Sequence, residues 1–67
     1  MWYKTKTMVF YIASNDVVWR VWQDGIASET DMEADAVANI CDPIDKPLES
    51  WADIALRTIN RRLAFSN

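Results

Sequence analysis

The sequence predicts an α+β fold in which an N-terminal antiparallel β-hairpin is followed by two α-helices packed on one of its faces, in the order ββαα. Two segments rich in β-branched and aromatic side chains open the chain, at residues 3–13 and 17–23. Two capping boxes and two apolar stripes of helical spacing follow them. A chain of 67 residues builds one hydrophobic core, so we expect a single domain over residues 1–67.

The first strand is predicted over about residues 3–13 because its side-chain pattern has a period near two. A Ser-Asn-Asp turn at residues 14–16 leads into the second strand, since Asn and Asp tolerate a positive φ. The register of this hairpin stays open. A two-residue turn would place Ile12 opposite Trp19, whereas a three-residue turn would place Tyr11 opposite Trp19.

The first helix is predicted from about residue 29 to residue 41. Ser28 with Asp31, and Thr30 with Glu33, form overlapping capping boxes at its start. Acidic side chains in a first turn also suit the helix dipole. An Asp-Pro dipeptide follows the helix and ends it, because the residue before a proline disfavours helical geometry.

The second helix is predicted over about residues 48–64. Its apolar stripe includes Ala55, Ile59 and Leu63 at helical spacing. A basic surface is expected on its last two turns, where the helix dipole favours cations. The arginines of this basic surface are Arg57, Arg61 and Arg62.

The sequence contains no recognisable set of catalytic, cofactor-binding or metal-binding residues. The chain has no histidine, which removes the commonest general base and the commonest metal ligand. Cys41 is the only cysteine and is expected to be a buried, inert thiol. Asp31 and Asp35 lie one helical turn apart, but they lack the spacing of a calcium-binding loop. We therefore expect no enzyme activity, no cofactor and no metal.

Charge is distributed unevenly along the chain. Residues 24–53 carry nine acidic side chains and a single lysine, and residues 54–67 carry three arginines and no acid. An acidic surface steers association with basic partners, so we expect a protein or ribonucleoprotein partner with a basic surface. With a pI of about 4.6, nucleic acid is an unlikely partner. The predicted acidic surface comprises Asp24, Glu29, Asp31, Glu33 and Asp35.

Both faces of the predicted hairpin are apolar, and Trp19 and Trp22 point to opposite faces because side chains alternate along a strand. In one interpretation the helices straddle the twisted hairpin and shield most of both faces. In the other, one face is left for a partner or for a homodimer through the hairpin. The residues predicted to bind the partner are Trp22, Arg20, Tyr11 and Val18.

These features predict a non-enzymatic, acidic binding protein that inhibits or regulates a larger macromolecule by forming a stoichiometric complex. The chain is a single small acidic domain with no catalytic motif, and in these respects it is similar to small phage-encoded inhibitors of bacterial defence, the anti-CRISPR proteins among them. That resemblance implies a host complex that targets nucleic acid as the partner. Two alternatives stay open: a small nucleic-acid-binding regulator that uses the C-terminal arginines, and a dimeric accessory protein.

A cytoplasmic location is expected. No apolar run approaches the roughly 20 residues that a membrane-spanning helix needs. A lone cysteine fits a reducing compartment better than a secreted, disulfide-framed domain. If the protein is phage-encoded, the compartment is the cytoplasm of the bacterial host.

Overall fold

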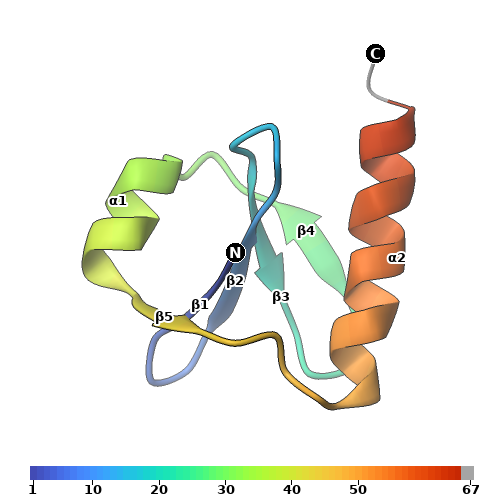
Figure 1. Ribbon diagram of the computed structural model, residues 1–67, viewed down its shortest axis with the longest axis horizontal. Coiled ribbons are helices and arrows are strands. Elements are labelled where there is room, and N and C mark those ends of the chain that lie inside the picture. The colour runs from blue at the N-terminus through green and yellow to red at the C-terminus, as the bar shows by residue number, and fades with distance from the viewer. Residues whose placement is uncertain (66–67) are drawn as a thin grey trace.

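The computed structural model has three layers, with a five-stranded antiparallel sheet between two helices (Figure 1). The strand order in the sheet is β4-β3-β2-β1-β5. The structure describes residues 1–65, so the last two residues of the predicted 1–67 domain lie outside the described part. The elements are β1 (Trp2–Lys4), β2 (Val9–Ile12), β3 (Val18–Val21), β4 (Ala27–Glu29), α1 (Ala34–Ile40), β5 (Asp42–Ile44) and α2 (Ser50–Ala64).

The predicted ββαα fold is therefore wrong, and its first error is the continuous strand over residues 3–13. The chain turns back within that segment and forms two paired strands, with Lys4 opposite Val9. Thr5 fixes the turn, because its Oγ1 accepts hydrogen bonds from the backbone N–H groups of Thr7, at 3.3 Å, and Met8, at 3.1 Å. A hydroxyl that bonds nearby backbone in this way competes with a straight strand.

The hairpin of β2 and β3 has the three-residue turn, so Tyr11 lies opposite Trp19. The N–H of Ala13 bonds to the carbonyl of Val17 at 3.0 Å and closes the turn. Asp16 supplies the positive φ, at 65°, which Asp tolerates better than most residues. This register places Trp19 on the α2 side of the sheet, where it is 5% exposed.

The predicted start of the first helix is also wrong, because residues 27–29 form β4 instead. The Asp24-Gly25 turn folds the chain back onto β3, with the N–H of Trp22 bonded to the carbonyl of Ile26 at 2.8 Å. Gly25 has a φ of 93°, a conformation that favours glycine. The helix begins only at Ala34, and its N-cap residue Glu33 makes no side-chain capping bond.

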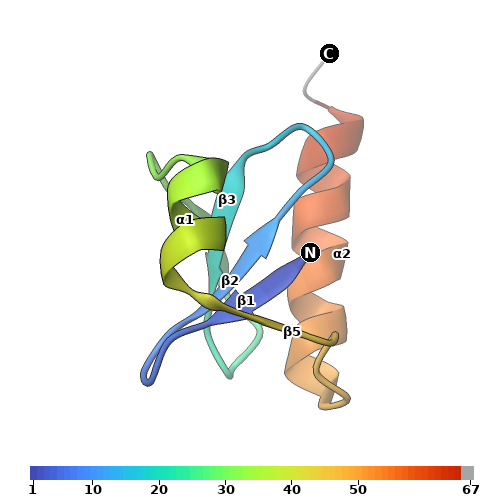
Figure 2. The ribbon, with the colours of Figure 1, turned by 60° about the vertical axis from the view of Figure 1, so that its left-hand side comes forward.

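The two helices cover opposite faces of the sheet, which corrects the expectation that both pack on one face (Figure 2). Side chains alternate between the faces of each strand, so β3 sends Val18 toward α1 and Trp19 toward α2. The buried cluster under α1 is Tyr3, Phe10, Val18, Val37 and Cys41. The buried cluster under α2 is Trp2, Ala13, Trp19, Val21, Ala52, Ala55 and Ile59.

Two short segments complete the sheet and the second helix. β5, which the sequence did not predict as a strand, pairs with β1 and places Pro43 opposite Tyr3. The second helix begins at Ser50, two residues after its predicted start, and ends at Ala64 as predicted. Trp2 ties β1 to this helix, because its ring lies 6.4 Å from that of Trp51 and 5.0 Å from that of Tyr11.

Candidate functional site

The sheet has two outer edges, and they differ in how well they are protected. Pro43 lies in the middle of β5, and proline on an edge strand hinders pairing with another chain. β4 holds only Ala27, Ser28 and Glu29 and has no proline. Among the described strands, none pairs with the outer side of β4. The edge at β4 is therefore the more open of the two.

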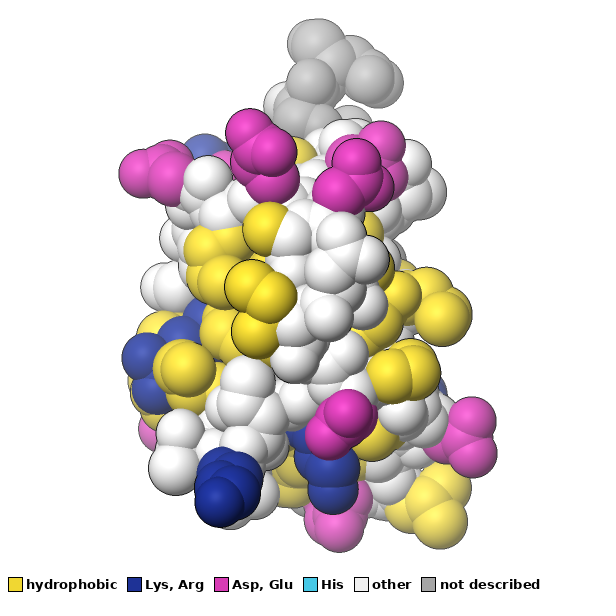
Figure 3. Space-filling view, turned by 90° about the vertical axis from the view of Figure 1, so that its left-hand side faces the viewer, with side chains coloured by type: hydrophobic (Ala, Val, Ile, Leu, Met, Phe, Trp, Pro, Cys, Tyr) yellow, Lys and Arg dark blue, Asp and Glu magenta, His cyan; other side chains and the backbone are white. Residues whose placement is uncertain are grey.

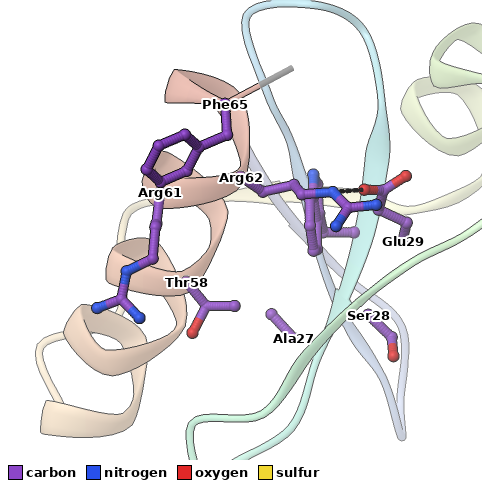
Figure 4. Close-up of a pocket in the computed structure, with 8 residues that line it drawn as sticks. Ala27, Ser28, Glu29, Thr58, Arg61, Arg62 and Phe65 are labelled. Atoms are coloured by element: carbon purple, nitrogen blue, oxygen red, sulfur yellow. Dashed lines mark hydrogen bonds and ion pairs between the residues drawn. The ribbon is translucent and has the colours of Figure 1, made fainter.

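A groove of about 570 Å³ runs between this open edge and the last turns of α2 (Figure 4). We call it the edge groove. Residues at positions 58, 61, 62 and 65 of the helix form one wall, which is one stripe at helical spacing. The edge groove is lined by Trp19, Ala27, Ser28, Glu29, Thr58, Arg61, Arg62 and Phe65.

Charge in the edge groove is only partly compensated. The Nε of Arg62 donates a hydrogen bond to the Glu29 carboxylate at 3.1 Å, and this pair spans the gap between α2 and β4 in Figure 4. Both side chains are largely exposed, so the pair contributes at most about 1 kcal/mol to stability, and another charged group can replace either partner at little cost. Arg61 has no ion pair among the described residues. The groove therefore has a net positive charge.

Trp19 lies in the wall of the edge groove and carries an unsatisfied donor. It is 5% exposed, and its Nε1 has no hydrogen-bond partner among residues 1–65. A buried donor without an acceptor costs about 1–3 kcal/mol. Phe65, at the other extreme, is 82% exposed at the rim. The groove thus combines an open strand edge, an unpaired arginine, an unsatisfied N–H and an exposed aromatic ring.

The four residues predicted to bind a partner are divided between the two faces. Arg20 and Trp22 lie together, with the guanidinium carbon 4.5 Å from the centroid of the indole ring. Trp22 is 36% exposed, so this pair is reachable from solvent. Val18 is fully buried, and Tyr11 packs with the cluster on the opposite face. The structure therefore leaves Trp22 exposed, Arg20 and Tyr11 half-buried, and Val18 buried.

The predicted acidic residues are not one continuous surface. Asp24 belongs to the β3–β4 turn, where its Oδ1 accepts the N–H of Ile26 at 3.0 Å, and Glu29 belongs to the edge groove. Asp31, Glu33 and Asp35 are exposed and make no ion pair among the described residues. Figure 3 shows a group of acidic side chains at the upper end of the α1 side, and further acidic side chains interspersed with lysine and arginine side chains toward its lower end.

The basic residues are divided as well. Arg61 and Arg62 line the edge groove, whereas Arg57 does not. A hydrogen bond from Lys46 holds the pKa of Asp53 below its usual range, and the charges of Lys46 and Arg57 lower that pKa further. This pair fixes the chain just before α2 to its first turn and lies outside the groove.

The part of the chain that the structure describes holds no cluster of three or more acidic or cysteine side chains that could bind a metal ion. Cys41 is a free, buried thiol under α1. None of the helices within residues 1–65 is long and apolar enough to cross a membrane. The edge groove brings together two arginines, a carboxylate, two hydroxyl side chains and two aromatic rings.

Comparison of the chain with models of protein families, with curated protein sequences and with solved structures finds no match in any of the three.

Sequence reasoning identified only part of the edge groove. It singled out Arg61, Arg62 and Glu29, but placed Glu29 at a helix start far from any strand edge. Ala27, Ser28, Thr58 and Phe65 were not considered as site residues. The signal that could have found them is the Asp-Gly dipeptide at residues 24–25, which is typical of a tight hairpin turn. A strand after that turn would have placed residues 27–29 at an edge.

Proposed function

We propose that the protein is a non-enzymatic binding protein that inhibits or regulates a larger macromolecule by forming a stoichiometric complex with it. The observation that carries this proposal is the edge groove, which lies beside β4, a strand edge that has no proline and pairs with no further strand within residues 1–65. Open strand edges bind extended segments through main-chain hydrogen bonds, and adjacent grooves select their side chains. A groove with arginine and aromatic residues also has the composition of binding hot spots.

In its most specific form, the proposed partner is a nucleic-acid-targeting defence complex and the protein is a phage-encoded inhibitor in the bacterial cytoplasm. Asp31, Glu33 and Asp35 support a basic partner, because these exposed carboxylates have no compensating cation among the described residues. Unpaired surface charge accelerates association with an oppositely charged partner. The similarity in size and charge to anti-CRISPR proteins motivates the choice of complex.

The test is affinity capture followed by native mass spectrometry of the captured complex. We expect one copy of the protein per partner. Two variants should each abolish the complex. One is the double variant Arg61→Ala with Arg62→Ala, and the other is the triple variant Asp31→Asn, Glu33→Gln and Asp35→Asn. Arg57→Ala is the matched control, because it removes an arginine of the same helix that lies outside the edge groove. A protein that modifies its target without forming a complex would disprove the proposal.

A second candidate function is a nucleic-acid-binding regulator. One observation favours it. Arg61, Arg62 and Phe65 share one groove, and single strands bind proteins through cations combined with aromatic rings on which bases stack. A salt-dependent gel shift of labelled single-stranded RNA or DNA, reduced by Arg61→Ala, would support this candidate. The absence of a shift at low salt would rule it out.

A further inference from the structure

We infer that the edge groove binds an extended acidic segment of the partner, which adds to the sheet as a sixth strand beside β4. This inference deepens the proposed function and rests on it. It names the chemistry of the occupant: a strand whose groove-facing side chains include a carboxylate for Arg61 and an apolar group for Phe65.

The hydrogen-bonding pattern of β4 defines which backbone groups are available. The N–H of Thr30 bonds to the carbonyl of Val18, and that of Trp22 to the carbonyl of Ile26. Bonded and non-bonded pairs alternate along an antiparallel ladder, so the backbone groups of Ala27 and Glu29, which pair with Val21 and Trp19, point away from β3. These two residues offer two donors and two acceptors to an added strand.

The same pattern fixes which side chains of the added strand enter the groove. Ala27 and Glu29 send their side chains to the α2 side of the sheet, as do their partners Val21 and Trp19. Residues that exchange hydrogen bonds with Ala27 and Glu29 would share that side. The residues that supply main-chain bonds to β4 are therefore the same residues whose side chains meet α2.

Charge selects an acidic occupant. Arg61 has no ion pair among the described residues, and Arg62 is held only by an exposed pair with Glu29. In Figure 4 Arg62 spans the gap between α2 and β4, whereas the Arg61 side chain points away from β4. A carboxylate in the gap would therefore meet Arg62 first and would pair with Arg61 once that flexible side chain turned toward the groove that it lines. The unsatisfied Nε1 of Trp19 belongs to the sheet side of the same groove and would gain a partner if an acceptor oxygen of the added strand reached it.

A second copy of this chain is a poorer occupant of the edge groove. Pairing β4 with β4 around a two-fold axis would place two α2 helices on the same side of the joined sheet. Arg61 and Arg62 of both copies would then lie at one interface, where the acidic side chain among the described residues that line the groove, Glu29, would supply two carboxylates for four cations. Like charges at an interface are unfavourable, so the groove favours a heterologous segment.

The probe is a capped seven-residue peptide, Thr-Val-Thr-Asp-Thr-Val-Thr, titrated into the full-length protein. In the added strand its valines and aspartate face α2 and its threonines face the other side. We expect saturable shifts of the Ala27 and Glu29 amide signals in NMR spectra, together with slower hydrogen exchange at both amides. Replacing the aspartate by lysine should weaken binding at least about tenfold, as should Arg61→Ala. Arg57→Ala should leave the affinity unchanged.

Backbone methylation provides a test that leaves the protein unaltered. Methyl groups on the valine and aspartate amides would block the hydrogen bonds to β4, so this peptide should not bind. Methyl groups on the threonine amides would point away from β4 and should leave the affinity within about threefold. Equal binding by both methylated peptides would overturn the strand addition, and equal binding by the lysine peptide would overturn the acidic preference.

Three further results would also overturn the inference. The first is tighter binding of a single-stranded oligonucleotide than of the peptide, with the same dependence on Arg61. The second is concentration-dependent protection of Ala27 and Glu29 without peptide, which would indicate a homodimer through β4. The third is a captured stoichiometric complex that depends on Asp31, Glu33 and Asp35 but tolerates Arg61→Ala. That last result would leave the proposed function standing and reject only this site.

Discussion

Gly25 shows how a single residue decides the position of β4 and hence of the edge groove. Its φ of 93° closes the turn after Trp22. A Cβ at this position would lie 2.7 Å from Cγ2 and 2.9 Å from Cβ of Ile54, so the turn also packs directly on α2. The only glycine of the chain therefore combines a left-handed backbone with a close approach to a helix.

Gly25→Ala should destabilise the protein by about 2–4 kcal/mol, from the left-handed conformation and the clash together. That loss is a large share of the free energy of unfolding, which is roughly 3–5 kcal/mol for a domain of this size. Urea unfolding followed by tryptophan fluorescence measures this change in the free energy of unfolding. Combining Gly25→Ala with Ile54→Ala should cost about 1 kcal/mol less than the sum of the single changes. Strict additivity would show that the turn does not press on the helix.

At the scale of elements, the sequence predicted the second helix well and the segment around residues 27–31 badly. The second helix has a long apolar stripe, which tertiary contacts reinforce. Ser28 and Thr30 resemble capping residues, but such side chains serve strands and turns equally well. The hydroxyl of Thr30 donates to the carbonyl of Val18 at 2.9 Å and accepts the N–H of Met32 at 3.2 Å. It thus ends β4 rather than beginning a helix.

Substitutions at residues 28 and 30 distinguish a role at the end of a strand from a role at the start of a helix. Thr30→Val keeps the shape but removes the hydroxyl, and we expect a loss of about 1–2 kcal/mol in the free energy of unfolding. Ser28→Ala should change stability by less than about 0.5 kcal/mol, because Ser28 is exposed on β4 and makes no side-chain bond among the described residues. If residue 28 instead capped a helix, its replacement would cost about 1 kcal/mol. Thermal unfolding by circular dichroism distinguishes the outcomes.

At the scale of the whole molecule, the three-layer arrangement accounts for the apolar character of both sheet faces. The sequence showed that β2 and β3 are apolar on both sides but suggested that two helices could cover only one side. The length of the chain made that argument reasonable, yet each face of the five-stranded sheet has its own helix and its own buried cluster. α1 has only seven residues, and Arg20 and Trp22 remain accessible on its face. Which of the residues predicted to bind a partner stay exposed could not be derived without this placement.

The layers make a prediction about energetic coupling between the two helices. Val37 on α1 and Ile59 on α2 are both buried, in separate clusters on opposite faces of the sheet. Val37→Ala should cost about 2 kcal/mol and Ile59→Val about 1 kcal/mol. Because no cluster residue is shared, the double variant should lose the sum of both within about 0.5 kcal/mol.

Sucrose in the urea titration keeps the double variant folded enough to measure, because excluded osmolytes favour burial. Ala55→Gly combined with Ile59→Val is the matched control, since both residues belong to the cluster under α2 and neighbours in one cluster couple. A coupling above about 1 kcal/mol between Val37 and Ile59 would mean that the two helices share one core. The sheet would then not separate their side chains into two independent clusters.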